Sequence, residues 1–555
     1  MIRLGARSLV AVFRRPSAAI CVAIVLFIFL PVLARGQGEA VLTRHMREEV
    51  SSGQAAWVGR LPASQTLRLT IALPLRNESD LDDLLQELYD PQSPSYHQFL
   101  SVEDFTERFG PPQADYDALV SFLEASGMTV TGTASNRMIV NVTGPAANIE
   151  RAFHTTLSEY QHPTEDRTFY APDREPTTDL PFALWHITGL DNFSIPRPAS
   201  LVRVAEARGG QTGSGPGGYF LGSDIRAAYY GGTALNGAGQ SVGLLEFAGY
   251  NIADVQNYFA QVKQPLNVTV KGVSTDGSSL SCTGSCDDTE QALDIEEAIS
   301  MAPGMTSVLV YVSDTSDVSI FNRMASDNIA KQLSCSWGWS PADPSSDDPI
   351  FKEFAAQGQN LFVASGDSGA YRSRSRYVYP ADDAYVTSVG GTDLTTASAG
   401  GPWKSETAWA DSGGGISPNH IAIPAYQLLK GVITTANKGS TAYRNCPDVA
   451  AGANTDNYIC YDGTCAGGWG GTSFAAPRWA GYLALTNQQA VANGLKPLGF
   501  INPTLYSIGL GSSYGADFHD ITSGSNGTYS AVTGYDLVTG WGSPNGTGLI
   551  NALAP

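Results

Sequence analysis

The sequence predicts an α/β fold, a mostly parallel sheet flanked by helices, preceded by a smaller α+β domain. Two observations support this prediction. The second half of the chain alternates short apolar runs with helical patterns, which is typical of parallel strands joined by helices. The first part holds a compact mixture of strand and helix patterns, and a segment rich in Gly, Ser and Arg follows it.

Length and composition divide the chain into four parts, because 555 residues exceed one ordinary domain. The Gly-rich segment is typical of a flexible linker and a natural cleavage site. The expected parts are a signal peptide at 1–36, an N-terminal domain at 57–200, the linker at 201–217 and a large domain at 218–555.

Hydrophobic periodicity predicts the elements of each domain. The N-terminal domain should contain strands at 66–75 and 138–142 and helices at 80–89, 116–126 and 146–153. The large domain should contain buried strands at 241–247, 307–312, 332–336 and 361–364, and an apolar helix from 473 to about 493. The rhythm of strand and helix after residue 218 is the basis for expecting a parallel sheet.

The first residues favour export. Four arginines precede an apolar run at 18–34, a pattern that predicts a secretory signal. The run is long, so an uncleaved membrane anchor stays open as an alternative. We expect a secreted protein with no stable membrane partner after the signal is removed.

Charge and cysteine content narrow the class of protein to which the chain can belong. Charged residues make up 15% and the net charge is −20, which argues against nucleic-acid binding and suits an acidic milieu. Six cysteines follow the signal, consistent with disulfides in an oxidising compartment. Six allow fifteen connectivities. Local spacing favours Cys282 with Cys286 and Cys460 with Cys465, which would leave Cys335 and Cys446.

Ser473 is the candidate nucleophile. It follows the glycines of the motif at residues 466–477 and lies at the start of the predicted apolar helix. Free N–H groups at a helix start favour negative charge, so a hydroxyl there has donors nearby for a developing oxyanion. A plain helix N-cap is the alternative.

A serine nucleophile needs a base, and histidines are scarce after residue 200. Glu290 and Asp294 lie four residues apart and share one face of a predicted helix, so a carboxylate base is the better candidate. An acidic solvated face is one alternative. A calcium cluster is another, because acidic residues crowd this segment: Asp287, Asp288, Glu296 and Glu297.

A third acidic candidate, Asp367, follows the buried run at 361–364, where α/β folds place functional groups. The surrounding Gly-Asp-Ser-Gly looks like the nucleophile motif of chymotrypsin-like proteases. Those proteases are all-β and need a preceding histidine, whereas no histidine lies between residues 187 and 419. We therefore reject Ser368 as nucleophile.

These motifs together resemble the sedolisin family of serine-carboxyl peptidases, including the kumamolisins. The resemblance rests on Glu-x-x-Leu-Asp-Ile, Ser-Gly-Asp-Ser-Gly and Gly-Thr-Ser-x-x-x-Pro in this order. It implies a subtilisin-like fold, an activation prodomain at 57–200 and a peptidase domain at 218–555. It also implies a substrate-binding edge at Ser336, Trp337 and Gly338.

The resemblance implies a role for each candidate. Ser473 would attack the peptide carbonyl, Glu290 would take its proton, and Asp294 would orient Glu290. Asp367 would donate to the oxyanion, which requires it to be protonated. Two close carboxylates cannot both ionise cheaply, so Glu290 and Asp294 should titrate as a pair. A carboxylate base and a protonated Asp367 both favour acidic conditions.

The C-terminal loops are the candidate metal site. Asp520 and Asp536 lie in Gly-rich loops that could supply carboxylates and carbonyls to a hard cation, or could be plain turns. The resemblance implies one Ca²⁺ held by these two side chains and by three backbone carbonyls: Ile521, Val532 and Gly534.

We therefore predict a secreted, acid-acting serine endopeptidase made as a self-processing zymogen. Its partners would be polypeptide substrates and its own prodomain, and we expect a monomer. A tripeptidyl aminopeptidase of the same family is one alternative. A catalytically inactive, calcium-stabilised surface-binding protein is the other.

Overall fold

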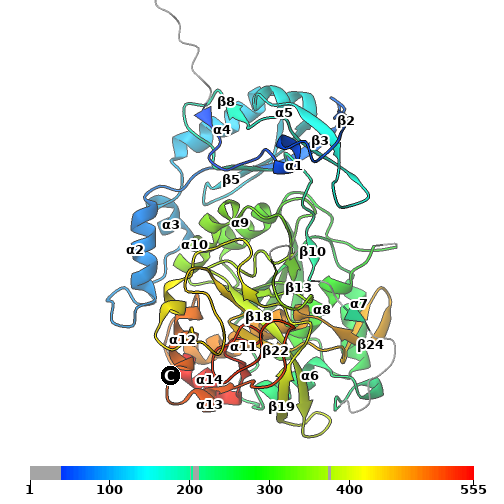
Figure 1. Ribbon diagram of the computed structural model, residues 1–555, viewed down its shortest axis with the longest axis vertical. Helices are drawn as coiled ribbons and strands as arrows, with labels where there is room; N and C mark the ends of the chain where they lie inside the picture. The colour runs from blue at the N-terminus through cyan, green and yellow to red at the C-terminus, as the bar shows by residue number, and fades with distance from the viewer. Residues whose placement is uncertain (1–38, 200–201, 204–211, 285, 373–376) are drawn as a thin grey trace, which may run out of the picture. The chain divides into compact units, whose positions relative to one another are not determined.

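A computed structural model describes residues 39–199, 202–203, 212–284, 286–372 and 377–555. The compact unit Gly38–Pro555 contains all of them and is shown in Figure 1. The predicted signal peptide at 1–36 and most of the linker at 201–217 lie outside the described residues.

Antiparallel strands and short helices build the N-terminal part. Strand β3 pairs with β5 on one side and β9 on the other, and β4 pairs with β5. Strand β6 lies between β2 and β7 in a second sheet. The strands are β2 (Trp57–Arg60), β3 (Thr66–Ala72), β4 (Thr129–Thr133), β5 (Ile139–Pro145), β6 (Leu157–Gln161), β7 (Thr168–Pro172) and β9 (His186–Thr188).

Among the described residues, four helices of seven or more residues accompany these sheets. Leu119 and Leu123 of one helix and Ile149 of another are buried in one apolar cluster with Ile71 and Val140 of the strands. The predicted α+β mixture is therefore confirmed, with each element within a few residues of its expected range. The helices are α2 (Glu78–Leu88), α3 (Val102–Arg108), α4 (Gln113–Ala125) and α5 (Ala146–Ala152).

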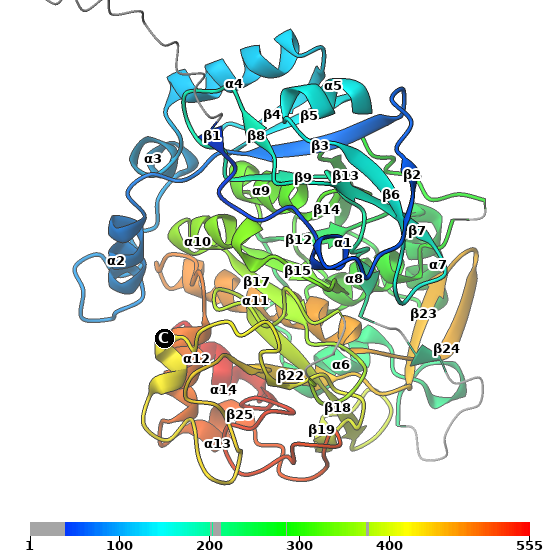
Figure 2. The same ribbon diagram turned by 45° about the horizontal axis from the view of Figure 1, so that its top comes forward.

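One eight-stranded sheet forms the centre of the large domain, in the order β13-β14-β12-β15-β17-β18-β19, with β22 also pairing with β18. Only the β18–β19 pair is antiparallel within this sheet. Figure 2 shows its strands. They are β12 (Ser241–Glu246), β13 (Thr269–Ser274), β14 (Ser307–Val312), β15 (Gln332–Cys335), β17 (Asn360–Ala364), β18 (Thr387–Thr396), β19 (Trp403–Ala408) and β22 (Val449–Gly452).

Helices cover both faces of this sheet (Figures 1 and 2). Helices α8 and α11 pack together, and α11 also packs on β15, β17, β18 and β22. Helices α9 and α10 contact strands of the same sheet from the other side. The predicted mostly parallel sheet flanked by helices is thus confirmed. The helices are α6 (Gly222–Tyr229), α7 (Ile252–Gln261), α8 (Thr289–Met301), α9 (Asp317–Asp327), α10 (Asp348–Ala356), α11 (Thr472–Ala492), α12 (Asn502–Gly509), α13 (Tyr514–Asp517) and α14 (Gly546–Leu553).

Helix α11 is buried over most of its length because nearly every side chain in it is apolar or small. Such a helix belongs in the core of a large domain rather than on its surface. It begins directly after Gly471, whose φ of 156° ends the preceding strand. The predicted helix from 473 to about 493 is confirmed.

Two disulfides tie local loops. Cys282 pairs with Cys286, and Cys460 pairs with Cys465 across the hairpin of β23 (Asn457–Tyr461) and β24 (Thr464–Gly470). Cys335 and Cys446 are free and buried. The pairing favoured by spacing is confirmed.

Candidate active site

Ser473 lies in the first turn of α11 and is fully buried. Its hydroxyl donates to the Ser336 carbonyl at 3.5 Å. Pro477 is four residues further along and has no N–H, so the Ser473 carbonyl lacks its usual helical donor. The Ser336 hydroxyl approaches that carbonyl at 3.3 Å instead. The proline therefore opens a contact between the nucleophile's backbone and the end of β15.

Glu290 and Asp294 lie one turn apart on α8 and are buried. The Ser336 hydroxyl donates to Asp294 Oδ1 at 2.8 Å. Burial, and then the neighbouring Asp294, raise the pKa of Glu290 well above its ordinary value. Burial likewise raises the pKa of Asp294. The nearby Ser473 hydroxyl offsets part of the rise in the pKa of Glu290. Neither oxygen of Glu290 accepts a hydrogen bond from the described residues.

A third buried carboxyl, Glu246 at the end of β12, completes a cluster that the sequence analysis missed. The Trp337 indole donates to Glu246 Oε2 at 2.9 Å. Burial and the charge of Asp294 raise the pKa of Glu246. The remaining oxygens of the cluster accept no hydrogen bond from the described residues: Glu246 Oε1, Asp294 Oδ2 and both oxygens of Glu290.

Buried acceptors without donors are costly, so these carboxyls must share protons among themselves. The three groups therefore titrate as a unit rather than singly. The sequence signal that could have indicated Glu246 is a charged residue at the end of an apolar strand, here the last residue of β12.

Asp367 follows β17 in the loop that begins at Gly366, whose φ is 101°. Its Oδ1 accepts two hydrogen bonds from Thr472, from the amide at 2.6 Å and from the hydroxyl at 2.7 Å. Its Oδ2 is buried and accepts nothing from the described residues. Burial raises the pKa of Asp367 to about 8. A neutral carboxyl with one free oxygen beside Thr472 is positioned to donate a proton.

The predicted edge at Ser336, Trp337 and Gly338 holds a strand of the chain itself. Strand β10 (Arg197–Pro198) pairs antiparallel with β16 (Trp337–Gly338). The Ala199 amide donates to the Ser336 carbonyl at 3.0 Å. Strand β11 (Val202–Arg203) then pairs antiparallel with Gly470 and Trp469 of β24.

The Ser336 carbonyl thus receives both the Ala199 amide and the Ser473 hydroxyl. Ala199 also lines a small hollow together with Asp367. The described residues of the segment 197–203 therefore lie along both edges of the candidate site, residues 197–199 along β16 and residues 202–203 along β24. They place Ala199 beside the nucleophile.

Comparisons with known proteins identify relatives over most of the chain. The chain is 31% identical to kumamolisin of Bacillus sp. (strain MN-32) over 552 residues, covering 93% of this chain and 96% of that protein. It is 30% identical to sedolisin of Pseudomonas sp. (strain 101), covering 89% and 88%. It is 28% identical to tripeptidyl-peptidase 1 of Canis lupus familiaris, covering 90% and 93%.

The chain belongs to the sedolisin family. Residues 54–193 match the family described as "Pro-kumamolisin, activation domain", and residues 302–498 match the "Subtilase family". A structure titled Pseudomonas sedolisin (serine-carboxyl proteinase), complexed with two molecules of pseudo-iodotyrostatin, shares 28% identity and a TM-score of 0.53. It covers 62% of this chain and 98% of that chain. This sedolisin-family chain is a serine-type peptidase with an activation domain.

The loops expected to hold calcium bring Asp520 and Asp536 to one short segment, 532–534. Gly534 donates its amide to Asp520 Oδ1 at 3.2 Å, and Val532 donates its amide to Asp536 Oδ2 at 3.1 Å. Burial raises the pKa of Asp536 to about 7 and also raises that of Asp520.

Oxygen donors suited to a hard cation are available here. Among the described residues, nothing donates a hydrogen bond to three backbone carbonyls of this region: Ile521, Val532 and Gly534. The buried carboxyl of Asp536, the half-buried carboxyl of Asp520 and the free carbonyls fit Ca²⁺. The described part of the chain holds no group of three or more His, Cys, Asp or Glu side chains able to hold a metal, so backbone oxygens would have to complete the site.

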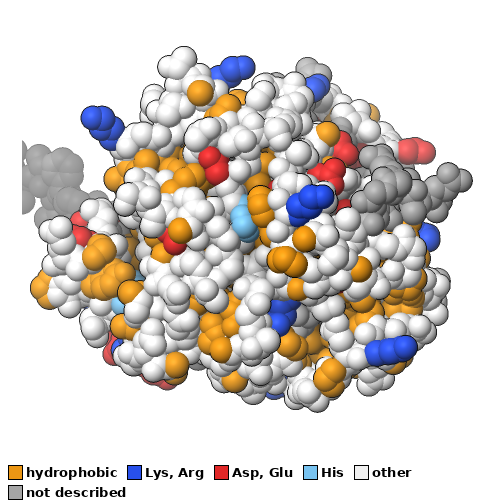
Figure 3. Space-filling model, turned by 90° about the horizontal axis from the view of Figure 1, so that it is seen from below, with side chains coloured by type: hydrophobic (Ala, Val, Ile, Leu, Met, Phe, Trp, Pro, Cys, Tyr) orange, Lys and Arg blue, Asp and Glu red, His pale blue; other side chains and the backbone are white. Residues whose placement is uncertain are grey.

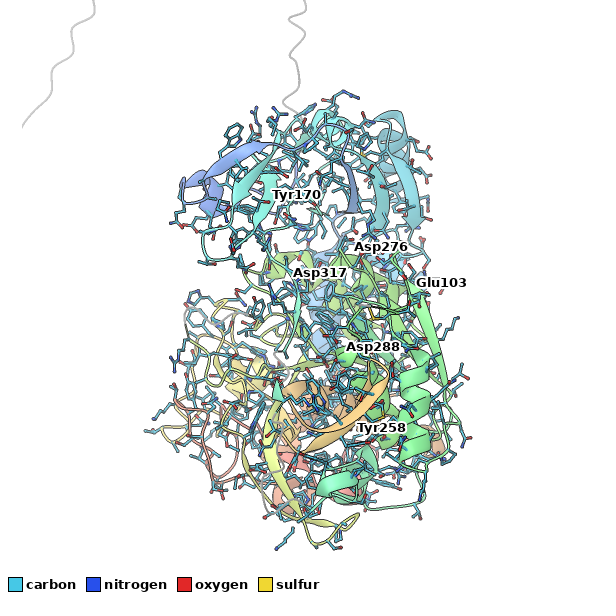
Figure 4. All side chains as sticks on the ribbon, turned by 90° about the vertical axis from the view of Figure 1, so that its right-hand side faces the viewer. Glu103, Tyr170, Tyr258, Asp276, Asp288 and Asp317 are labelled. Atoms are coloured by element: carbon cyan, nitrogen blue, oxygen red, sulfur yellow. A yellow bond between two sulfur atoms is a disulfide. The ribbon has the colours of Figure 1, made fainter. Side chains whose placement is uncertain are left out.

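The rival acidic cluster on α8 is not a metal site in the described structure. Asp288 accepts the Asp462 amide at 3.0 Å, and Figure 4 shows it beside the β23–β24 hairpin. Glu296 accepts the Cys460 amide. Glu297 forms a buried ion pair with Arg478 at 2.8 Å. Each acidic side chain serves a different structural contact.

The described surface adds two observations. Lys and Arg side chains are scattered over the face shown in Figure 3 rather than gathered in one patch. Among the helices that the structure describes, none has the length and apolar character needed to cross a bilayer.

Proposed function

We propose that this sedolisin-family peptidase is a secreted, acid-acting endopeptidase made as a zymogen that cleaves itself. The observation that carries this proposal is the segment 197–203 in the candidate site. The Ala199 amide and the Ser473 hydroxyl meet at one carbonyl, that of Ser336. The bond after Ala199 is therefore the proposed processing site.

Ser473 attacks the carbonyl carbon of Ala199, and its hydroxyl proton passes to Glu290. Asp294 hydrogen-bonds and orients Glu290, and Asp367 donates a hydrogen bond to the oxyanion of the tetrahedral intermediate. Glu290 then gives the proton to the departing amine as the C–N bond breaks, leaving an acyl-enzyme. Water hydrolyses the ester by the same route and frees Ser473.

Two proton requirements set the pH range. The carboxyl cluster must lose one proton to accept another from Ser473, which sets the acidic limb. Asp367 must keep its proton, so activity falls as pH rises through its pKa of about 8. Both requirements are met only between these limits.

The position of the proposed bond supports endopeptidase action over tripeptidyl-peptidase action. Described residues lie against the peptidase edges on both sides of the proposed bond, at β10 and at β11. The chain before Arg197 continues into the activation domain, so the proposed self-cleavage cuts an internal bond with more than three residues before it. Fragment masses from an unfolded protein would separate the two modes, since a tripeptidyl-peptidase releases only tripeptides.

The test is acidification of the purified precursor, followed by mass spectrometry and N-terminal sequencing. We expect cleavage after Ala199 and none in the Ser473→Ala precursor. The matched control is Ser368→Ala, since Ser368 is exposed beside Asp367 and should be dispensable. Cleavage by pure Ser473→Ala protein would refute the nucleophile.

Calcium and export complete the proposal. One Ca²⁺ would be held by the carboxylates of Asp520 and Asp536 with the carbonyls of Ile521, Val532 and Gly534. It would cross-link two loops and neutralise buried charge. Residues 1–36 would direct secretion, which N-terminal sequencing of the exported precursor tests directly.

A further inference from the structure

Two basic side chains of the segment 197–203 lie over aromatic rings of the peptidase domain. The guanidinium carbon of Arg197 is 5.9 Å from the ring centroid of Tyr377. The guanidinium carbon of Arg203 is 5.5 Å from the ring of Trp469. Both distances are within the range of cation–π attraction. The rings flank the proposed bond after Ala199, one on each side.

The position of Tyr377 is fixed by its backbone. Its φ is +62°, a left-handed conformation that few non-glycine residues adopt. A Cβ atom on Gly338 would lie 2.2 Å from the Tyr377 carbonyl oxygen, so only glycine admits this approach. Tyr377 also lines the hollow that contains Asp367 and Ala199. Its ring is therefore part of the wall of the site.

Trp469 is held by packing rather than by a special backbone. It lies on β24, paired with Arg203 in the strand register. Its ring packs edge-to-face on Tyr461 with centroids 5.0 Å apart, and it joins a cluster with Leu293 of α8 and Phe474 of α11. The hairpin that carries it is closed by the Cys460–Cys465 disulfide.

Aromatic rings suit recognition of a basic side chain in acid. A carboxylate that binds Arg loses its charge when it is protonated, whereas the ring quadrupole does not titrate and Arg stays charged. Arg197 also lies 4.0 Å from Glu165 of the activation domain. That carboxylate leaves with the activation domain, while Tyr377 stays with the peptidase.

We propose that the cleft selects polypeptides with a basic side chain three residues before the cleaved bond and another four residues after it. Tyr377 determines the first preference and Trp469 the second. The inference rests on the proposed peptidase mechanism and on cleavage after Ala199.

The experiment uses mature enzyme and quenched peptides that copy residues 195–204. Arg197, Arg203 or both are replaced by citrulline, which keeps the shape of Arg without its charge. We expect kcat/KM to fall about two- to fivefold for each replacement, equally at pH 4 and pH 6.

Variants assign each preference to its ring. Tyr377→Leu should remove only the preference at the first position, and Trp469→Leu only that at the second. Tyr377→Phe keeps a ring and is the matched control, which should retain the preference. If Tyr377→Leu fails to fold, the comparison of Arg and citrulline peptides on the unaltered enzyme still tests the preference.

Three results would overturn the inference: equal rates on Arg and citrulline peptides, a preference that vanishes on acidification, or an unchanged preference in both leucine variants. In each case Ser473-dependent cleavage of the peptides would leave the proposed function standing. Absence of all Ser473-dependent cleavage would instead refute the proposed function.

Discussion

In the proposed mechanism, the proton on Asp367 decides whether the oxyanion meets a donor or a like charge. Burial keeps this carboxyl neutral up to a pKa of about 8, far above the ordinary 3.8. The donor is therefore present below that pH and lost as pH rises through it. We expect Asp367→Ala to lower kcat by ~100- to 1000-fold with little change in KM.

Asp367→Asn supplies the control, because an amide donates but does not ionise. It should retain more activity than Asp367→Ala and weaken the alkaline limb of the kcat profile measured from pH 3 to 9. A wild-type enzyme most active at pH 8, or an Asp367→Ala enzyme with normal turnover, would contradict the proposed role.

Single residues also show what sequence can predict about the site. Glu290, Asp294, Asp367 and Ser473 could be named as candidates because each lies in a short local motif, and the structure brings them to one region. Glu246 and Thr472 were missed, because their roles depend on contacts between strands and helices far apart in the chain. No local spacing encodes the bond from Thr472 to Asp367.

At the scale of elements, a buried ion pair joins α8 and α11, the helices that carry the candidate catalytic residues. Arg478 of α11 donates to Glu297 of α8 at 2.8 Å, and to the Gly452 carbonyl at 2.6 Å and Asn457 Oδ1 at 2.8 Å. Glu297 lies one turn beyond Asp294. The pair therefore fixes the helix carrying Ser473 relative to the helix carrying Glu290, its proposed base.

Arg478→Met should lower the free energy of unfolding by about 3–5 kcal/mol, because it leaves the Glu297 charge buried and unpaired. Adding Glu297→Met should recover much of that loss. Urea unfolding of the Ser473→Ala precursor measures both without self-cleavage.

The control for this prediction is Arg323→Met, which breaks an exposed pair with Asp327 on α9 and should cost less than about 1 kcal/mol. Double-variant stability no better than that of Arg478→Met would show that the buried charge is not the cause.

The elements themselves were predictable because apolar periodicity is local. The sheet order was not, since β12 lies between β14 and β15 although β13 precedes β14 in the chain. The role of Pro477 likewise needed the structure, because it depends on Ser336 approaching the carbonyl that the proline leaves open.

At the scale of the whole molecule, acid should weaken the N-terminal part. His45 donates a hydrogen bond from Nδ1 to the Thr43 carbonyl and accepts one from the Ile187 amide at Nε2. One donor and one acceptor nitrogen require the imidazole to be neutral. Its ring stacks on His186. Burial, and then His186, lower the pKa of His45 to about 3; burial, and then Arg47, do the same for His186.

Nearby acids act the other way, since Asp191 and Asp343 favour the charged form of His45, and Glu175 lies 3.9 Å from it. Burial outweighs them. Each histidine binds its proton more readily when unfolded, so stability is full above pH 6.5 and falls as pH drops toward 3, by about 1.4 kcal/mol per pH unit for each histidine.

We expect a His45→Gln, His186→Gln double variant of the Ser473→Ala precursor to lose less stability than its parent between pH 6.5 and 4. Urea unfolding at fixed pH values checks this. The comparison with the parent cancels the carboxyl groups that titrate in the same range. Identical slopes in parent and variant would exclude the histidines.

Calcium binding is the other whole-molecule prediction. An ion bound only by the native state raises stability by mass action. EDTA should therefore lower the Tm of the mature enzyme, and Asp520→Asn should remove most of that sensitivity. Asp517→Asn, at a neighbouring carboxyl bonded to Ser513, is the matched control. Equal melting curves with and without chelator would eliminate the calcium site.

The segment 197–203 has a kinetic consequence. It is joined covalently to the enzyme that binds it. Its effective concentration at the active site is therefore higher than free peptides reach. Its proposed cleavage would be a first-order event whose rate constant is unchanged by dilution. The newly formed carboxyl end at Ala199 would then remain bound as a product inhibitor and compete with incoming peptides until the severed domain dissociates. Cleavage of the chain would consequently precede the appearance of activity, and dilution would hasten only the appearance of activity.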